Sequence, residues 1–197
     1  MNVVPVTLEG RRVRLEPLAA EHVGALCVYG LDEDLWHFTM TQVHSPEEMR
    51  AYVETALDEQ ARGVSLPFVT IERATGEVVG CTRFGNIERA HRGVEIGWTW
   101  VARPFQRTPV NTEAKYLMLR HAFEDWNCIR VALKTDSINV RSRSAILRIG
   151  ATEEGTLRNH MITSTGRVRH TTYFSVTDAE WPAVKASLEE KLSRTRV

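Results

Sequence analysis

The sequence predicts an α/β protein with one mixed, mostly antiparallel sheet of about six to seven strands, flanked by helices. Three segments rich in β-branched and aromatic residues follow one another between residues 66 and 102, separated only by short turns. Helical and strand-like segments then alternate. No repeat, linker or low-complexity segment divides the 197 residues, so we expect one domain over residues 1–197.

Composition excludes several classes of protein. The chain has 25 basic and 25 acidic residues, a balance that argues against a nucleic-acid binder. No run of about 18 apolar residues would span a membrane, and the N-terminus lacks the pattern of a signal peptide, so we expect a cytoplasmic protein. The three cysteines form no CxxC pair and the seven histidines lack metal-binding spacing, so we expect inert thiols and no metal.

The first third of the chain is expected to hold one strand and two helices. Residues 10–18 alternate apolar side chains with arginines, as in a half-buried strand closed by a proline. Residues 19–30 are predicted to be helical and to end at a glycine. A second helix begins after Ser45, an N-cap residue followed by Pro46, and is expected to end near Arg62.

The remaining elements follow from periodicity and turn signals. The three strands of the meander are residues 66–73, 77–88 and 92–102. After them we predict a helix, a strand, a helix, two strands and a helix at residues 111–126, 128–136, 137–151, 151–163, 166–177 and 178–192. The helix at 111–126 is expected to begin with Asn111 as its N-cap.

The polar turn before residue 111 is a candidate anion site. It follows a strand and a bend at Pro104, and the first amides of a helix, together with its dipole, attract anions. Arg103 and Arg107 support this interpretation. The alternative is an ordinary capped helix, since the carboxylate of Glu113 in the first turn could neutralise the same dipole.

Several stretches, taken in order, resemble the GCN5-related N-acetyltransferase (GNAT) superfamily, in the RimJ/RimL branch of ribosomal-protein N-terminal acetyltransferases. They are LEGRRVRLEPL, VEIGWTWV, QRTPVNTEAKYLML, KTDSINVRSRSAILRIGATEEGTLR and EWPAVKASLEEKL. The resemblance covers nearly the whole chain and rests on the ordered set of stretches. It implies a GNAT-type domain.

The resemblance implies that acetyl-CoA lies where the fourth and fifth strands of the family's sheet separate. Here the fourth strand would be residues 94–101, where Gly97 suits a bulge or is a plain strand glycine. The implied cofactor-binding residues are Trp98, Thr99, Trp100, Val101, Gln106, Arg107, Thr108, Val110, Asn111, Thr112, Asn139 and Arg141. The family's loop glycines are replaced by Pro109 and Asn111, and proline removes one amide donor.

Two residues are candidates for the chemistry. Glu95 lies in an otherwise apolar strand and is the expected general base, although it could equally be an edge glutamate paired with an arginine. Ser142 matches the branch's Asn-x-x-Ser pattern and is the expected acid toward the departing thiolate. The alternatives are that Asn139 is only an N-cap, Ser142 a first-turn serine and Arg141 part of a solvated face.

The acceptor is expected beside Trp36, His37 and Phe38, which lie between the first two helices, although such residues more often cover a core. We therefore predict N-acetylation of a primary amine, either a protein N-terminus or a small amine, by direct attack in a ternary complex. Expected partners are acetyl-CoA and the acceptor, without nucleic acid or membrane, and the resemblance also allows a homodimer. A CoA-binding regulatory module and a cofactor-free interaction domain are the alternatives.

Overall fold

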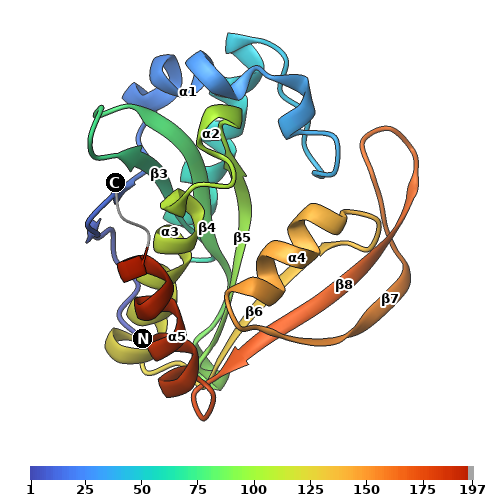
Figure 1. Ribbon diagram of the computed structural model, residues 1–197. Helices are drawn as coiled ribbons and strands as arrows, with labels where there is room; N and C mark the ends of the chain where they lie inside the picture. The colour runs from blue at the N-terminus through green and yellow to red at the C-terminus, as the bar shows by residue number, and fades with distance from the viewer. Residues whose placement is uncertain (195–197) are drawn as a thin grey trace.

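The computed structural model describes residues 1–194 and contains an eight-stranded sheet (Figure 1). Its strands are β1 (Leu8–Glu9), β2 (Val13–Pro17), β3 (Leu66–Glu72), β4 (Val78–Glu88), β5 (Gly93–Val101), β6 (Arg130–Asp136), β7 (Thr152–Ile162) and β8 (Val168–Thr177). Their spatial order is β1-β2-β3-β4-β5-β6-β8-β7. Only β5 and β6 pair in parallel, so the predicted mixed, mostly antiparallel sheet is confirmed. The strand that the sequence did not predict is the two-residue β1.

Helices cover both faces of this sheet. They are α1 (Val23–Gly30), α2 (Pro46–Ala61), α3 (Pro109–Arg120), α4 (Val140–Arg148) and α5 (Trp181–Arg194). The predicted start of α2 is confirmed, since the Ser45 hydroxyl accepts a hydrogen bond from the amide of Glu48. The predicted start of α3 is wrong. Its N-cap is Thr108, because Pro109 suits the first helical position and Thr108 Oγ1 accepts from the Val110 amide at 3.3 Å.

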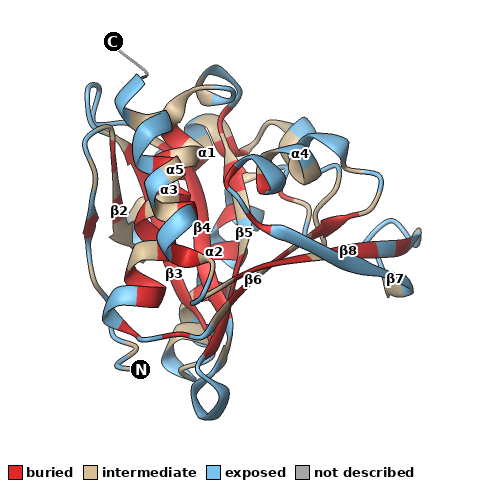
Figure 2. Cartoon of the chain, turned by 60° about the horizontal axis from the view of Figure 1, so that its bottom comes forward, coloured by how far each residue is buried: buried red, intermediate tan, exposed pale blue. Residues whose placement is uncertain are grey.

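The core has two parts. Apolar side chains of α3, α4 and α5 pack on one face of the sheet, and those of α1 and α2 pack on the other face against β3, β4 and the end of β5. Buried residues are concentrated in the central strands, whereas β7 is exposed along most of its length (Figure 2). No helix among residues 1–194 is long and apolar enough to span a bilayer.

Strands β5 and β6 form hydrogen-bonded pairs only at their beginnings. Residues 93–95 pair with residues 130–132, and beyond them the two strands diverge (Figure 1). The remainder of β5 therefore has no strand partner on this side, and α4 lies in front of β6 near the opening.

A bulge in β5 lies at the level where the strands part. Cys81 of β4 faces Trp100 and Arg83 faces Gly97, so two residues of β5 oppose one residue of β4. Trp98, inside the bulge, has a φ of 49°. The bulge that the sequence suggested near Gly97 is confirmed.

The two edges of the sheet are irregular. β1 has only two residues. β7, at the other edge, changes its register against β8 between Glu153 and Gly155 and again between Leu157 and Met161.

Candidate active site

The turn between β5 and α3 forms one wall of the opening. The side-chain amide of Gln106 donates to the carbonyl of Val101 at 2.9 Å, and Arg107 has a left-handed φ of 62°. Pro109 has no amide hydrogen and the Val110 amide bonds to Thr108. The first amides of α3 that remain for a ligand are those of Thr108 and Asn111.

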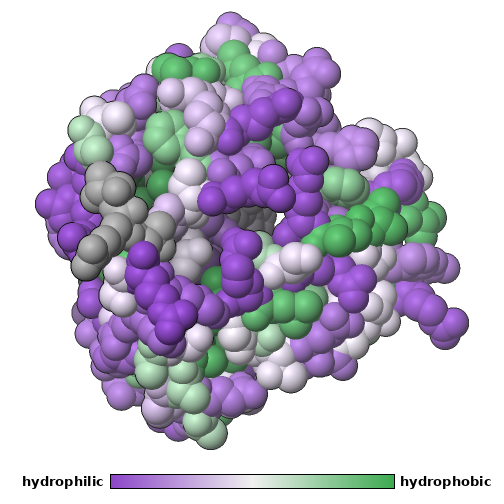
Figure 3. All heavy atoms as spheres, viewed as in Figure 1, coloured by the Kyte–Doolittle hydropathy of each residue, from purple (hydrophilic) through white to green (hydrophobic). Residues whose placement is uncertain are grey.

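A cavity of about 240 Å³ lies beside this turn and is lined by Asp34, Leu35, Arg103, Gln106 and Arg141. In the view of Figure 3 the surface is hollowed between β5 and α4, with hydrophilic residues around the hollow. Gln106 comes from the turn and Arg141 from the first turn of α4. The fold thus brings together two residues that the sequence placed in one binding site.

Two arginines, Arg141 at this cavity and Arg107 in the turn beside it, favour an anion. Arg103 is neutralised by Asp32, with Nε 2.9 Å from Oδ2, and by a further ion pair with Asp34. Among residues 1–194, Arg107 and Arg141 form no ion pair and both are exposed. The Asn111 Oδ1 atom is buried without a hydrogen-bond partner. The two guanidinium groups and the amides of Thr108 and Asn111 fit a pyrophosphate, whereas the Asn111 oxygen is an acceptor that would need a donor.

Glu113 does not neutralise the N-terminus of α3. Its carboxylate is buried and accepts hydrogen bonds from the amides of Arg11, Arg12 and Val13, at 3.1, 2.6 and 2.7 Å. It is therefore committed to the turn between β1 and β2, which removes one objection to the anion site.

The structure places Asn139 at the N-cap of α4. Its Oδ1 accepts from the amide of Ser142 at 3.0 Å, which is the structural alternative that the sequence left open. Ser142 is half-buried and Arg141 exposed. The contacts of these residues with acetyl-CoA stay predictions.

Glu95 lies near the parallel junction of β5 and β6 and is 4% exposed. Its Oε2 accepts from Asn86 Nδ2 at 2.8 Å and lies 3.0 Å from Lys134 Nζ. Because Glu95 is in register with Ala132, Lys134 and Asp136 share its face of the sheet. The helices on this face pack on the other half of the sheet, so Glu95 faces the open half.

A row of alternating rings and cations crosses the same face. We call it the cation–aromatic row; its members, from α2 to β8, are Tyr52, Arg83, Trp98, Lys134 and Tyr173. The Arg83 guanidinium carbon lies 5.2 Å from the ring centroids of both Tyr52 and Trp98. Lys134 Nζ lies 6.0 Å from that of Trp98 and 5.8 Å from that of Tyr173. A second cavity, of about 290 Å³, opens over Tyr52, Arg83 and Trp98.

Lys115 lies below the bulge and was not expected from the sequence. Its Nζ donates to Thr99 Oγ1 at 2.6 Å and to Thr82 Oγ1 at 3.1 Å. Burial, with no carboxylate beside it, lowers the pKa of Lys115 from 10.5 to about 7. Thr99 also donates to the Gly97 carbonyl, so this network fixes the bulge.

The expectation of an exposed aromatic cluster is wrong for Trp36. Its side chain is 2% exposed, packs edge-to-face on Tyr52 and donates from Nε1 to the Gly30 carbonyl at 2.7 Å. Burying a large ring is favourable once its N–H has a partner. His37 is exposed and Phe38 half-buried, and their contact with an acceptor stays a prediction.

Trp100 and Val110 are also core residues, 4% exposed each, so acetyl-CoA could reach only their backbone atoms. The cysteines are free and show no sign of activation: burial raises the pKa of Cys128 to about 11 and also raises those of Cys27 and Cys81. The described residues contain no group of three side chains able to hold a metal ion.

Comparison with known proteins decides the family. A family model described as an acetyltransferase (GNAT) domain matches residues 12–152. The chain belongs to the GNAT family. This family uses acetyl-CoA, and the family membership expected from the resemblance is confirmed.

The GNAT relatives cover nearly the whole chain. The "Putative ribosomal N-acetyltransferase YdaF" of Bacillus subtilis is 28% identical over 175 residues, 87% of this chain and 92% of that one. A GCN5-related N-acetyltransferase from Brucella melitensis is 30% identical, with a TM-score of 0.90 over 98% of this chain and 90% of that one. Mycobacterium smegmatis RimJ, solved in complex with CoA-disulfide, shares the fold at 24% identity, with a TM-score of 0.82 over 96% of each chain.

The residues of this GNAT site that the sequence did not reveal are mostly strand cations. Arg83 of β4 and Arg169 of β8 lie inside strands that are apolar or neutral over most of their length, and Lys134 lies inside β6 between the charged ends Arg130 and Asp136. A charged residue inside a strand was used as a signal only for Glu95, and the same signal would have found these three.

Proposed function

We propose that this GNAT protein transfers the acetyl group of acetyl-CoA to a primary amine in a ternary complex. One observation carries the proposal: the parted strands β5 and β6 open beside the free amides of Thr108 and Asn111. The exposed backbone of β5 would bind the pantetheine arm, and Arg107 and Arg141 would bind phosphates. The complex of RimJ with CoA-disulfide supports the same kind of ligand for this fold.

The reaction needs an amine that has lost its proton, although an α-amine has a pKa of about 8. Glu95 would take that proton, directly or through one water, as the amine nitrogen attacks the thioester carbon. A C–N bond forms and the C–S bond breaks. The thiolate would accept a proton from the Ser142 hydroxyl, which would regain one from solvent, or it would accept one from solvent directly. Asn86 and Lys134 would hold the carboxylate in place.

The acceptor class is the less specific part of this proposal. The printed name of the Bacillus subtilis relative points to a ribosomal protein, so we favour a protein N-terminus over an antibiotic or a polyamine. No described cysteine has the lowered pKa that a covalent acetyl-enzyme would need, which supports direct attack.

The test measures thiol release from acetyl-CoA with a panel of N-terminal peptides and small amines. We expect release that depends on the acceptor and falls by about 10²- to 10⁴-fold in Glu95→Gln, the usual contribution of a general base. Glu190→Gln, on the exposed side of α5, is the matched control and should act like the wild type. Binding of acetyl-CoA by calorimetry without acceptor-dependent release would instead indicate a CoA-binding module.

A further inference from the structure

The open half of the sheet carries buried charge that is not balanced among residues 1–194. Three ion pairs lie on this face: Arg83 with Glu59, Lys134 with Glu95, and Arg167 with Asp136. Arg169 of β8 is left over. It is 6% exposed, and among residues 1–194 no carboxylate lies within 4 Å of it.

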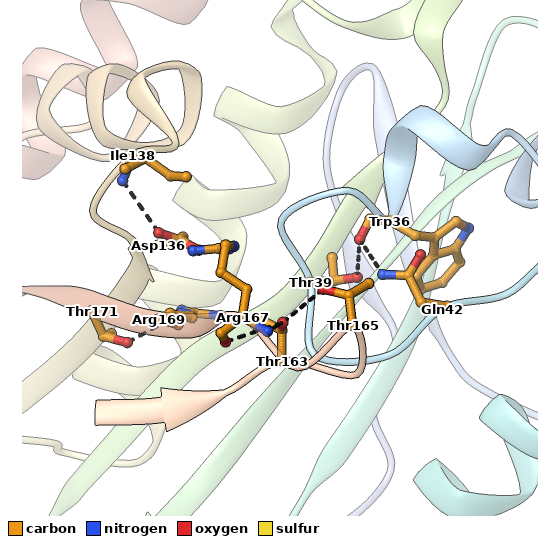
Figure 4. Close-up of polar contacts among 10 residues, drawn as sticks. All are labelled: Trp36, Thr39, Gln42, Asp136, Ile138, Thr163, Thr165, Arg167, Arg169 and Thr171. Carbon is orange, nitrogen blue, oxygen red and sulfur yellow. Dashed lines mark hydrogen bonds and ion pairs between the residues drawn. The ribbon is translucent and has the colours of Figure 1, made fainter. Parts of the chain in front are cut away.

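The neighbouring carboxylates of Asp136 and Glu95 are engaged by other cations, and neither forms an ion pair with Arg169. Asp136 accepts from the Ile138 amide at 3.2 Å on one oxygen and pairs with Arg167 through the other. Glu95 is held by Asn86 and Lys134. Arg169 instead donates a hydrogen bond from Nε to Thr171 Oγ1 at 3.1 Å (Figure 4).

An unpaired buried guanidinium destabilises a fold, since desolvation is not offset by a counter-charge. Burial lowers the pKa of Arg169, because the same desolvation disfavours its charged form. Its position offers a reason for its presence. Arg169 shares one face of β8 with Tyr173, whose ring centroid lies 5.8 Å from Lys134 Nζ. Lys134 Nζ in turn lies 3.0 Å from Glu95 Oε2, so Arg169 lies on the same open face as the candidate base.

We propose that Arg169 binds a carboxylate of the acceptor, so that the preferred acceptors are amines that also carry a carboxylate. The carboxylate can be that of a free amino acid or the side chain of an acidic residue following the N-terminal residue of a peptide. In either case it completes the fourth ion pair on this face, in the planar geometry that arginine offers to carboxylates. This inference rests on the proposed acetyl transfer.

The test compares two pairs of acceptors that differ only in the carboxylate: alanine with alaninamide, and Ala-Asp-Ala-amide with Ala-Asn-Ala-amide. For at least one pair we expect the wild type to prefer the acid by about 10- to 100-fold in kcat/KM, the usual effect of a charge-assisted hydrogen bond. Arg169→Gln should lose this preference while keeping turnover of the amides, and Arg169→Lys should keep part of it. The responding pair identifies the source of the carboxylate.

Arg158→Gln, on the exposed neighbouring strand β7, is the matched control and should keep the preference. Equal kcat/KM for both members of both pairs in an active enzyme would overturn the inference, as would an unchanged preference in Arg169→Gln. If no acceptor supports thiol release, the proposed function fails, and calorimetric titration of the same four compounds decides the inference alone. Tighter binding of an acid than of its amide, lost in Arg169→Gln, supports it; no difference overturns it.

Discussion

At the scale of single residues, the unusual group is the ammonium of Lys115. It is buried at the interface of α3 with β4 and β5, and it contacts two threonine hydroxyls instead of a carboxylate. A lysine whose pKa falls to about 7 carries its charge at the expense of stability below that pH. Lys115 also fixes the two threonines that hold the bulge. It therefore orders the bulge beside the candidate site while its buried charge lowers the stability of the fold.

We therefore expect Lys115→Met to be more stable than the wild type at pH 6, by about 2–4 kcal/mol. Between pH 7 and 10.5 the unfolded chain binds more protons at this lysine than the folded chain does, so wild-type stability rises with pH. The methionine variant should lack this rise, and its advantage should disappear by about pH 10. Urea unfolding at pH 6, 8 and 10 measures this. An advantage that is equal at all three pH values would contradict the buried-charge explanation.

At the scale of secondary-structure elements, α3 is tied to the first hairpin by one carboxylate. Three consecutive amides of the β1–β2 turn converge on Glu113. Gly10 lies so close that a Cβ there would come within 2.7 Å of Glu113 Oε2. The N-terminal hairpin thus positions the helix whose first turn borders the proposed cofactor site.

Glu113→Ala should lower the free energy of unfolding by about 3 kcal/mol, because it leaves three buried or half-buried amides without an acceptor. Gly10→Ala should act in part through the same contact, by displacing the carboxylate, and in part through the Val13 carbonyl, which a Cβ would approach to 2.8 Å. The double variant should therefore lose less unfolding free energy than the sum of the losses in the two single variants. Glu190→Ala, at an exposed position of α5, is the control. Full additivity in urea unfolding would show that Gly10 and Glu113 act separately.

Much of the element order could be predicted, because periodicity and turn residues are local. The first turn of α3 was misplaced since Thr108 and Asn111 are both good caps, and Pro109 should have decided between them as Pro46 did for α2. The surroundings of Glu95 could not be predicted. Lys134 reaches it only through the register of two parallel strands, which depends on the whole sheet.

At the scale of the whole molecule, the site exists because the sheet is covered unequally. α3, α4 and α5 pack along one face, whereas α1 and α2 cover only part of the other. The parting of β5 from β6 connects these two sides. In the proposed reaction, acetyl-CoA would enter from the side of the turn before α3, and the amine would approach Glu95 and the cation–aromatic row from the open face.

Saturating acetyl-CoA should slow amide hydrogen exchange at residues 96–101 and 107–112, because the ligand would cover the unpaired part of β5 and the mouth of α3. Residues 93–95 are already paired with β6 and should change little. At 100-fold excess over Kd the ligand should also stabilise the fold by about 2.7 kcal/mol. Mass spectrometry of exchanged peptides measures the pattern. Protection confined to α2 would place the ligand in the other cavity and contradict the proposed site.

The irregular register of β7 has a consequence for the association of one copy of the chain with another. A strand from another copy that approached this border would find amides and carbonyls out of step around residues 154 and 158–160. The opposite border offers too short a strand to serve as a template. Addition of strands from other copies is thus hindered at both edges of the sheet. The opening between β5 and β6 can therefore persist without fibre-like association of the chains.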